Sequence, residues 1–457
     1  MTYFSLFYFL LLLSHYMSGF FFIFIISPLI ISYLAILYYF YKYMKNDYSV
    51  KFMPNILNFL LVALFLLEID NILYFYLKLK NTFPYSIHFA LIISLLILIV
   101  GIISFFKHIP FFSKFNFYIL CISVFIIDIL IIYWGGKPPI DVYYHLKEGV
   151  EYFLSFANPY SQSYTQIYSP KLVKAYYYDD PIFLKYVPFI SIPPVGFAFY
   201  TIGYVLGDIR IINAIVFCIS PFLLKDACNK LLPNLPDDSR KKLSIIPLLY
   251  PAQLHLIYHA WTETSIGFFI ILFIYFYLKD KKIASYISLG ILLSLKQTGV
   301  IYLLPFLFIM DLKDWKFYFI TGGIVLFPLL LYALWNLKDF VNSIILFEIR
   351  QPYRPDSIGI ASFLANIFNI KVYKAVSYGT ILLTSLIISI LYSIKKKPMM
   401  YAEKYKIKYM LYVVLFLVSN LVVYSKQSFL NQYYFMSILF YLTLLFSIKE
   451  QEDTQLA

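Results

Sequence analysis

The sequence has 457 residues, of which 61% are hydrophobic and only 13% are charged. Soluble domains contain about 45 to 50% apolar residues, so this composition excludes a water-soluble fold. The formal net charge of +13 does not indicate nucleic acid as a partner, because the basic residues lie in short loops between apolar runs, where they set membrane orientation.

Apolar runs of roughly the 20 residues that span a bilayer recur along the chain, and they must be helical because lipid cannot satisfy backbone N–H groups. The sequence therefore predicts an all-α, polytopic transmembrane bundle of about 13 to 14 spans. The predicted spans are 3–17, 19–42, 54–77, 86–106, 115–134, 211–225, 243–259, 265–279, 283–311 (as two short helices), 316–336, 374–393, 407–424 and 428–447.

A polar segment at 135–188 interrupts this pattern, and the apolar stretch 189–206 follows it. If 189–206 crossed the membrane, the positive-inside rule would orient the two halves of the chain in opposite directions. We therefore predict that 189–206, opened by Pro193-Pro194, is a juxtamembrane or re-entrant helix; a miscounted span elsewhere is the alternative. The polar segment then lies on the outer face of a multi-pass cell-membrane protein whose N- and C-termini are cytoplasmic.

Three acids lie inside the N-terminal half of the predicted bundle, namely Glu68, Asp70 and Asp128. Ionisable groups at membrane depth are costly and usually find polar partners on neighbouring helices. Hydrogen bonding between helices is the role we expect for them.

No residue pattern indicates a metal or a disulfide. The spacing of Cys121, Cys218 and Cys228 fits neither a disulfide framework nor a zinc site. Asp179-Asp180 resembles a metal-binding pair, but no third ligand accompanies it, so we expect a surface turn. We predict no metal and no cofactor.

Asp141 is the candidate general base, because it follows the end of a predicted helix at Trp134 and is thereby held at the membrane edge. A carboxylate there can accept the proton of an attacking hydroxyl while a lipid-linked donor stays within reach. The alternative is that Asp141 caps a helix N-terminus.

Polar and aromatic residues after Asp141 are candidates for substrate binding. Tyr144 and His145 come first, and Asn158 and Tyr160 flank a proline in a short rigid turn. Such turns suit the wall of a sugar site, and they equally suit a plain loop.

Four basic residues on the predicted outer side are candidates for gripping a phosphate: Lys296, Arg210, Arg350 and Arg354. A charge at the depth of Lys296 costs about 2.5 to 3.5 kcal/mol, so it should face a cavity or a partner. A lipid phosphate and an ion pair with Glu263 remain equal alternatives for Lys296. Arg350 and Arg354 could instead be solvated loop charges.

The order of these motifs resembles a known family. A helix end precedes Asp-x-x-Tyr-His from Asp141, then Asn-Pro-Tyr from Asn158, then Pro-Pro from Pro193 before a helix. This order is similar to that of the GT-C superfamily of polyprenyl-phosphate-dependent glycosyltransferases, above all the polyprenyl-phosphate-mannose-dependent mannosyltransferases. The family commonly has one helix before this loop, whereas this sequence has five.

The resemblance covers about 130–310, with Gly-Asp-Ile-Arg ending at Arg210, Trp-Thr-Glu-Thr from Trp261 and Ser-Leu-Lys-Gln-Thr-Gly from Ser294 as later motifs. It implies that Asp141, in the first large outer loop, is the catalytic carboxylate, and that Glu263 belongs to the substrate site. It also implies three regions, which are additional N-terminal helices at 1–114, a GT-C-like core at 115–310 with an outer loop at 135–210, and C-terminal helices at 311–457.

The expected function is transfer of a sugar, a hexose such as mannose, from a polyprenyl-phosphate donor to a glycan or lipid-linked acceptor at the outer face, with inversion. The donor is a substrate, so no cofactor is needed. A transporter or lipid flippase is the alternative, although transporters usually contain internal repeats and none is visible here. A third possibility is a non-catalytic subunit of a membrane complex.

Overall fold

The computed structural model describes residues 54–79, 85–106, 115–177, 180–250, 253–299, 314–352, single positions between 354 and 418, and 430–456. This part of the chain is almost entirely helical, and its one sheet pairs two short antiparallel strands, β1 (Tyr164–Thr165) and β2 (Tyr186–Val187). The all-α class is therefore confirmed. The predicted spans at 3–17 and 19–42 lie outside the described residues, as do most of 374–393 and 407–424.

The chain forms two compact units, and each unit combines segments that are distant in the sequence. Unit 1 comprises Met1–Pro138, Arg210–Asp280 and Phe440–Ala457, and unit 2 comprises Pro139–Ile209 and Lys281–Leu439. The division into three consecutive regions stays a prediction.

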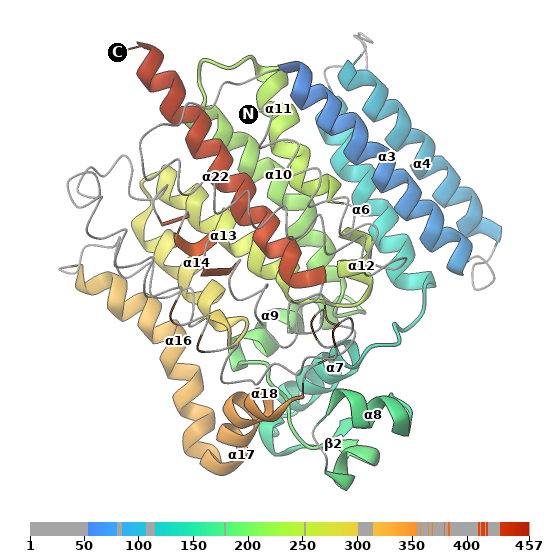
Figure 1. Cartoon of the computed structure of the whole chain (residues 1–457), viewed down its shortest axis with the longest axis vertical. Coiled ribbons are helices and arrows are strands. Elements are labelled where there is room, and N and C mark those ends of the chain that lie inside the picture. Colours follow the sequence, from blue (N-terminus) through green and yellow to red (C-terminus); the bar gives the residue numbers. More distant parts are fainter. Residues whose placement is uncertain are drawn as a thin grey trace. The chain divides into compact units, whose positions relative to one another are not determined.

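Unit 1 is a bundle of helices, most of which are apolar (Figure 1). Its helices are α3 (Pro54–Leu79), α4 (Tyr85–Phe106), α6 (Asn116–Trp134), α10 (Ile211–Leu231), the polar α11 (Asp237–Ile245), α12 (Gln253–Tyr258), α13 (Glu263–Leu278) and the later part of α22 (Leu430–Leu456). α4 packs along α6, and α10 packs along α6 and α13. These helices confirm that 54–77, 86–106, 115–134, 211–225 and 265–279 are helical, and their crossing of the membrane stays a prediction.

The predicted span at 243–259 is wrong as a single helix. α11 ends at Ile245, a 3-10 turn, η5 (Ile246–Leu249), follows, and α12 begins only at Gln253. Pro247 lies in the 3-10 turn, where its missing N–H interrupts helical hydrogen bonding. The described apolar residues of this run, Leu248 among them, are buried, but they do not form one continuous helix.

Three of the described helices, α6, α10 and α16 (Trp315–Trp335), are long and apolar enough to cross a membrane. α9 (Pro194–Val205) is shorter, with 12 residues. At 1.5 Å per residue it extends about 18 Å, against a hydrocarbon core about 30 Å thick. Its length therefore suits the predicted juxtamembrane helix, and its start at Pro194 agrees with the Pro-Pro signal.

Unit 2 contains the loop elements and the helices that support them. They are α7 (Asp141–Leu154), η3 (Pro159–Ser161), α8 (Pro170–Tyr176), η4 (Pro181–Leu184), α9, α14 (Lys282–Ser294), α16, α17 (Leu337–Val341), the π-helical η6 (Asn342–Leu346) and α18 (Phe347–Arg350). α7 packs on α9 at Gly149, where a Cβ atom would lie 2.4 Å from the Phe197 ring. A glycine is therefore required for the close approach of these two helices.

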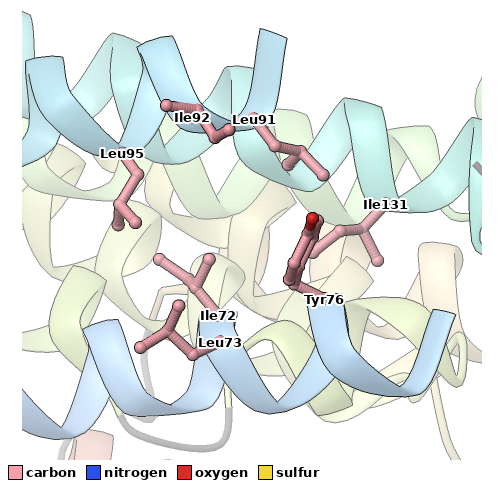
Figure 2. Close-up of a pocket in the computed structure, with 7 residues that line it drawn as sticks. All are labelled: Ile72, Leu73, Tyr76, Leu91, Ile92, Leu95 and Ile131. Atoms are coloured by element: carbon pink, nitrogen blue, oxygen red, sulfur yellow. The ribbon is translucent and has the colours of Figure 1, made fainter. Parts of the chain in front are cut away.

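An apolar cavity of about 130 Å³ lies between three helices of unit 1. Figure 2 shows its lining: Ile72, Leu73 and Tyr76 of α3, Leu91, Ile92 and Leu95 of α4, and Ile131 of α6. The Tyr76 hydroxyl is the only polar group among these side chains, and it lies 3.1 Å from His88 Nδ1. The cavity therefore offers little chemistry, and the acid–base residues lie elsewhere.

Candidate functional site

Asp141 begins α7, directly after Ile140 in extended conformation. The N-cap position belongs to Ile140, so the alternative that Asp141 is itself the N-cap residue is wrong by one residue. Asp141 Oδ1 instead accepts a hydrogen bond from the backbone N–H of Val142 at 2.8 Å. A carboxylate in the first turn of a helix is favoured by the helix dipole, and its side chain stays partly exposed.

Two tyrosines from the following loop hold Asp141 in place. The Tyr177 hydroxyl donates to Asp141 Oδ2 at 2.8 Å, and the backbone N–H of Asp141 donates to the Tyr168 hydroxyl at 3.3 Å. Burial, and then the Asp141 charge, raise the pKa of Tyr177 well above its ordinary value of 10.0. The Tyr177 hydroxyl is therefore protonated at neutral pH, and its hydrogen bond fixes the position of Asp141 Oδ2.

Arg354 borders the same group of tyrosines. Its guanidinium carbon lies 3.4 Å from the centroid of the Tyr176 ring, which meets the Tyr168 ring edge to face at 5.0 Å. Burial raises the pKa of Tyr168, and the positive charge of Arg354 opposes that shift. The structure thus brings together two predicted site residues, the carboxylate Asp141 and the guanidinium Arg354. Arg350 is exposed at the end of α18.

One and two turns after Asp141, α7 contacts strand β1 through His145 and Glu148. His145 Nε2 lies 3.3 Å from the Thr165 carbonyl oxygen, and Glu148 accepts hydrogen bonds from the Thr165 backbone and hydroxyl. Burial lowers the pKa of His145 from 6.5, although Asp141 and Glu148 oppose that shift. His145 is therefore neutral at physiological pH, and its contact with Thr165 links α7 to β1. Tyr144, one residue earlier, is partly exposed.

Asn158 and Tyr160 have structural partners. Asn158 Oδ1 accepts from the Tyr160 backbone N–H at 3.1 Å and so caps η3. The Tyr160 side chain is 1% exposed, its hydroxyl donates to the Ile192 carbonyl, and its ring contacts Tyr332 and Phe340. These contacts stabilise the packing of η3 within unit 2. A direct contact with substrate stays a prediction for both residues.

Lys296 lies where the sequence predicts a break. α14 ends at Ser294, and the backbone N–H of Gly299 bonds to the Lys296 carbonyl in the turn that follows. This turn packs near the start of α9, since a Cβ atom on Gly196 would lie 3.4 Å from the Leu295 carbonyl oxygen. The side chain of Lys296 is partly exposed. The second predicted helix of 283–311 lies outside the described residues.

Arg210, in unit 1, caps a helix. Its guanidinium donates to the carbonyls of Ile132 at 2.8 Å, Gly136 at 3.0 Å and Tyr258 at 3.4 Å, and it is 2% exposed. Cations stabilise the carbonyl-rich C-terminus of a helix, here that of α6. Binding of a phosphate by Arg210 stays a prediction, and these contacts do not favour it.

Glu263 is also in unit 1, in the first turn of α13, with 3% exposure. Its Oε2 accepts from the Thr262 hydroxyl at 3.4 Å. A carboxylate at a helix N-terminus is stabilised by the dipole, so this position has a structural explanation. Contact of Glu263 with substrate, or with Lys296, stays a prediction.

Tyr168, Tyr176 and Tyr177 are the site residues that sequence reasoning missed. The signal available was the run Tyr-Tyr-Tyr that begins at Tyr176, an unusual feature in a polar loop. Within the described residues, no group of three or more His, Cys, Asp or Glu side chains could hold a metal ion. Asp179 lies outside those residues, and Asp180 Oδ1 accepts from the Ile182 N–H and so begins η4.

Comparison with known proteins gives no assignment. No protein-family model matches the sequence, and no curated protein matches it.

Proposed function

We propose that this protein is an integral membrane glycosyltransferase with a GT-C-like arrangement of about 13 to 14 spans. It transfers a sugar from a polyprenyl-phosphate donor to a hydroxyl of a glycan or lipid-linked acceptor, with inversion at the anomeric carbon. Both termini are cytoplasmic, and the loop that begins at Asp141 lies on the outer face. Neither nucleic acid nor a metal takes part.

The arrangement of Asp141 is the single observation that carries the proposal. Its Oδ2 receives a hydrogen bond from Tyr177, its Oδ1 receives one from the Val142 N–H, and the side chain stays partly exposed. An anchored, accessible carboxylate is what a general base requires, since it must meet an incoming hydroxyl in a fixed geometry.

In the proposed reaction, Asp141 takes the proton of the acceptor hydroxyl as the hydroxyl oxygen forms a bond to the anomeric carbon. The bond between that carbon and the phosphate oxygen breaks, and the lipid phosphate leaves with the bonding electron pair. Negative charge therefore grows on the phosphate, where fixed cations stabilise it most. Lys296 and Arg354, both in unit 2 with Asp141, are the cations we propose for this role.

The decisive experiment for the activity is mass spectrometry of the glycans and glycolipids of a deletion strain. Loss of one sugar, restored by the wild-type gene and not by Asp141→Asn, is the expected result and would identify donor and acceptor. A deletion strain with an unchanged set of glycans and glycolipids would contradict the proposal.

A Lys296→Met variant tests the phosphate site, because it keeps the long apolar side chain and removes the charge. We expect the KM for the lipid-linked donor to rise about tenfold, as the loss of a charged hydrogen bond of about 1.5 kcal/mol requires. Lys338→Met, at an exposed position of α17, is the matched control and should leave KM unchanged. An unchanged KM in the Lys296 variant would remove it from the site.

Labelling tests the orientation. Cysteines introduced at Ser163 and Asn234, both exposed, are treated on intact cells with a membrane-impermeant thiol reagent, in a background without the three native cysteines. Ser163→Cys should react and Asn234→Cys should not, because one crossing, 211–225, separates them. Equal reaction at both would mean that 189–206 also crosses, and the outer-face placement of Lys296 would be wrong.

A further inference from the structure

Unit 1 contains a cluster of three buried polar side chains that the proposed reaction does not use. Glu68 on α3 and Asp128 on α6 are each 1% exposed, and Gln253 on α12 is 0% exposed. Gln253 Nε2 donates to both carboxylate oxygens of Asp128, at 2.6 and 2.7 Å. These hydrogen bonds join α12 to α6, and α3, which carries Glu68, packs on η5, just before α12 in the sequence.

The cluster has more hydrogen-bond acceptors than donors. Glu68 Oε2 and Gln253 Oε1 are both fully buried and have no hydrogen-bond partner. The Asp128 charge acts on Glu68, so the two carboxylates repel when both are ionised. Among the described residues, the Gln253 amide is the only hydrogen-bond donor to the carboxylates of this cluster.

No buried cation balances these acids within the described residues. None of the ion pairs there includes Glu68 or Asp128. Several titratable groups lie on the elements packed around the cluster. Cys218 lies near Asp128, and Lys225 lies over the Phe117 and Tyr118 rings. Lys242 pairs with Asp238, His88 bonds to Tyr76, and the His255 ring of α12 contacts the rings of His259 and Trp261. Each has another partner or no positive charge.

We propose that Glu68, Asp128 and Gln253 form a binding site for one monovalent cation, a proton or Na⁺. A proton on Glu68 converts an acceptor without a partner into a donor and removes one of two repelling charges. Na⁺ would use the same carboxylate and amide oxygens as ligands, because hard cations prefer oxygen. Either species neutralises one charge in a part of the protein where an unbalanced pair of carboxylates is costly.

Infrared spectroscopy of the purified full-length protein tests this site. The carbonyl band of a protonated carboxyl group is followed from about pH 5 to about pH 9, first in choline chloride and then in NaCl at the same ionic strength. We expect a band at neutral pH that disappears in Glu68→Gln and persists in Asp70→Asn. Asp70, exposed and two residues away on the same helix, is the matched control.

The two salts distinguish the two cations. Loss of the band on addition of NaCl, with release of one proton per protein, means that Na⁺ and the proton share the site, whereas an unchanged band means a proton site. If Glu68→Gln folds poorly, two measurements replace it. They are proton release by the wild-type protein on addition of NaCl, and the carbonyl band of the protonated carboxyl group in Asp128→Asn. Absence of a protonated carboxyl group at every pH, together with no binding of radioactive Na⁺ by the wild type, would overturn the proposal.

Discussion

Two carboxylates with opposite surroundings characterise this protein, Asp141 in unit 2 and Asp128 in unit 1. Asp141 is partly exposed and is held by a tyrosine hydroxyl and a backbone N–H. Asp128 is 1% exposed and, among the described residues, receives hydrogen bonds only from Gln253. The difference teaches that a base needs both an anchor and access to solvent, whereas an acid within the bundle needs a partner that neutralises it.

A similar contrast separates two arginines. Arg210 directs its guanidinium at three backbone carbonyls, whereas Arg354 lies over a tyrosine ring close to Asp141. The first arrangement is expected to support the fold, and the second leaves a positive charge on the group of tyrosines that holds the candidate base. Substitutions at these four residues and their neighbours can therefore separate catalytic from structural roles.

The largest effect is expected at Asp141. An Asp141→Asn variant keeps the shape of the side chain and loses the base, so turnover should fall by about 100-fold or more, with normal expression and folding. The matched control is Asp180→Asn, a carboxylate of the same loop that begins η4. Turnover above a few percent of the wild-type rate in Asp141→Asn, measured with radioactive donor, would show that this carboxylate is not the base.

The next effect is on stability. Arg210→Met leaves three backbone carbonyls without their donor, and the free energy of unfolding should fall by about 2 kcal/mol. Thermal unfolding in detergent measures the change, with Arg354→Met as the comparison. Arg354→Met should unfold near the wild-type temperature but bind donor more weakly. The reverse outcome would exchange the roles that we give to the two arginines.

A smaller effect is expected at Tyr177. The Tyr177→Phe variant loses one hydrogen bond of about 1 kcal/mol to Asp141, so kcat should fall about fivefold while the stacked ring remains. Tyr186→Phe, on β2 in the same loop, should leave kcat unchanged. Equal kcat values for the wild type and Tyr177→Phe would mean that Asp141 is anchored without this hydroxyl.

The smallest effect concerns pH. Because burial lowers the pKa of His145, the unfolded chain takes up this proton first as the pH falls. The stabilisation is present above the ordinary value of 6.5 and is lost as the pH falls below it. We expect the unfolding temperature to drop less between about pH 7.5 and about pH 5.5 in His145→Gln than in the wild type. An identical drop in both proteins would show that His145 does not titrate in this range.

The class of fold and the positions of α3, α4, α6, α10 and α13 could be predicted from hydropathy, and Asp141 was singled out as the candidate base from its place after a helix. The break in the predicted span at 243–259 could not be predicted in this way. Hydropathy measures apolar content, and Pro247 interrupts the helix without lowering that content. Tyr177 was also missed, since it lies 36 residues from Asp141 and nothing local links the two.

The sequence by itself determined that this chain belongs in a membrane, because the length and apolarity of each run are local properties. Tertiary structure alone decided which polar groups meet. Gln253 reaches Asp128 across 125 residues, and Arg210 reaches Ile132 across 78. A buried polar group must find its partner wherever packing brings one, and packing depends on the whole chain. The same physical rule that makes a run of apolar residues visible in the sequence therefore leaves the partner of a buried charge invisible until the helices are assembled.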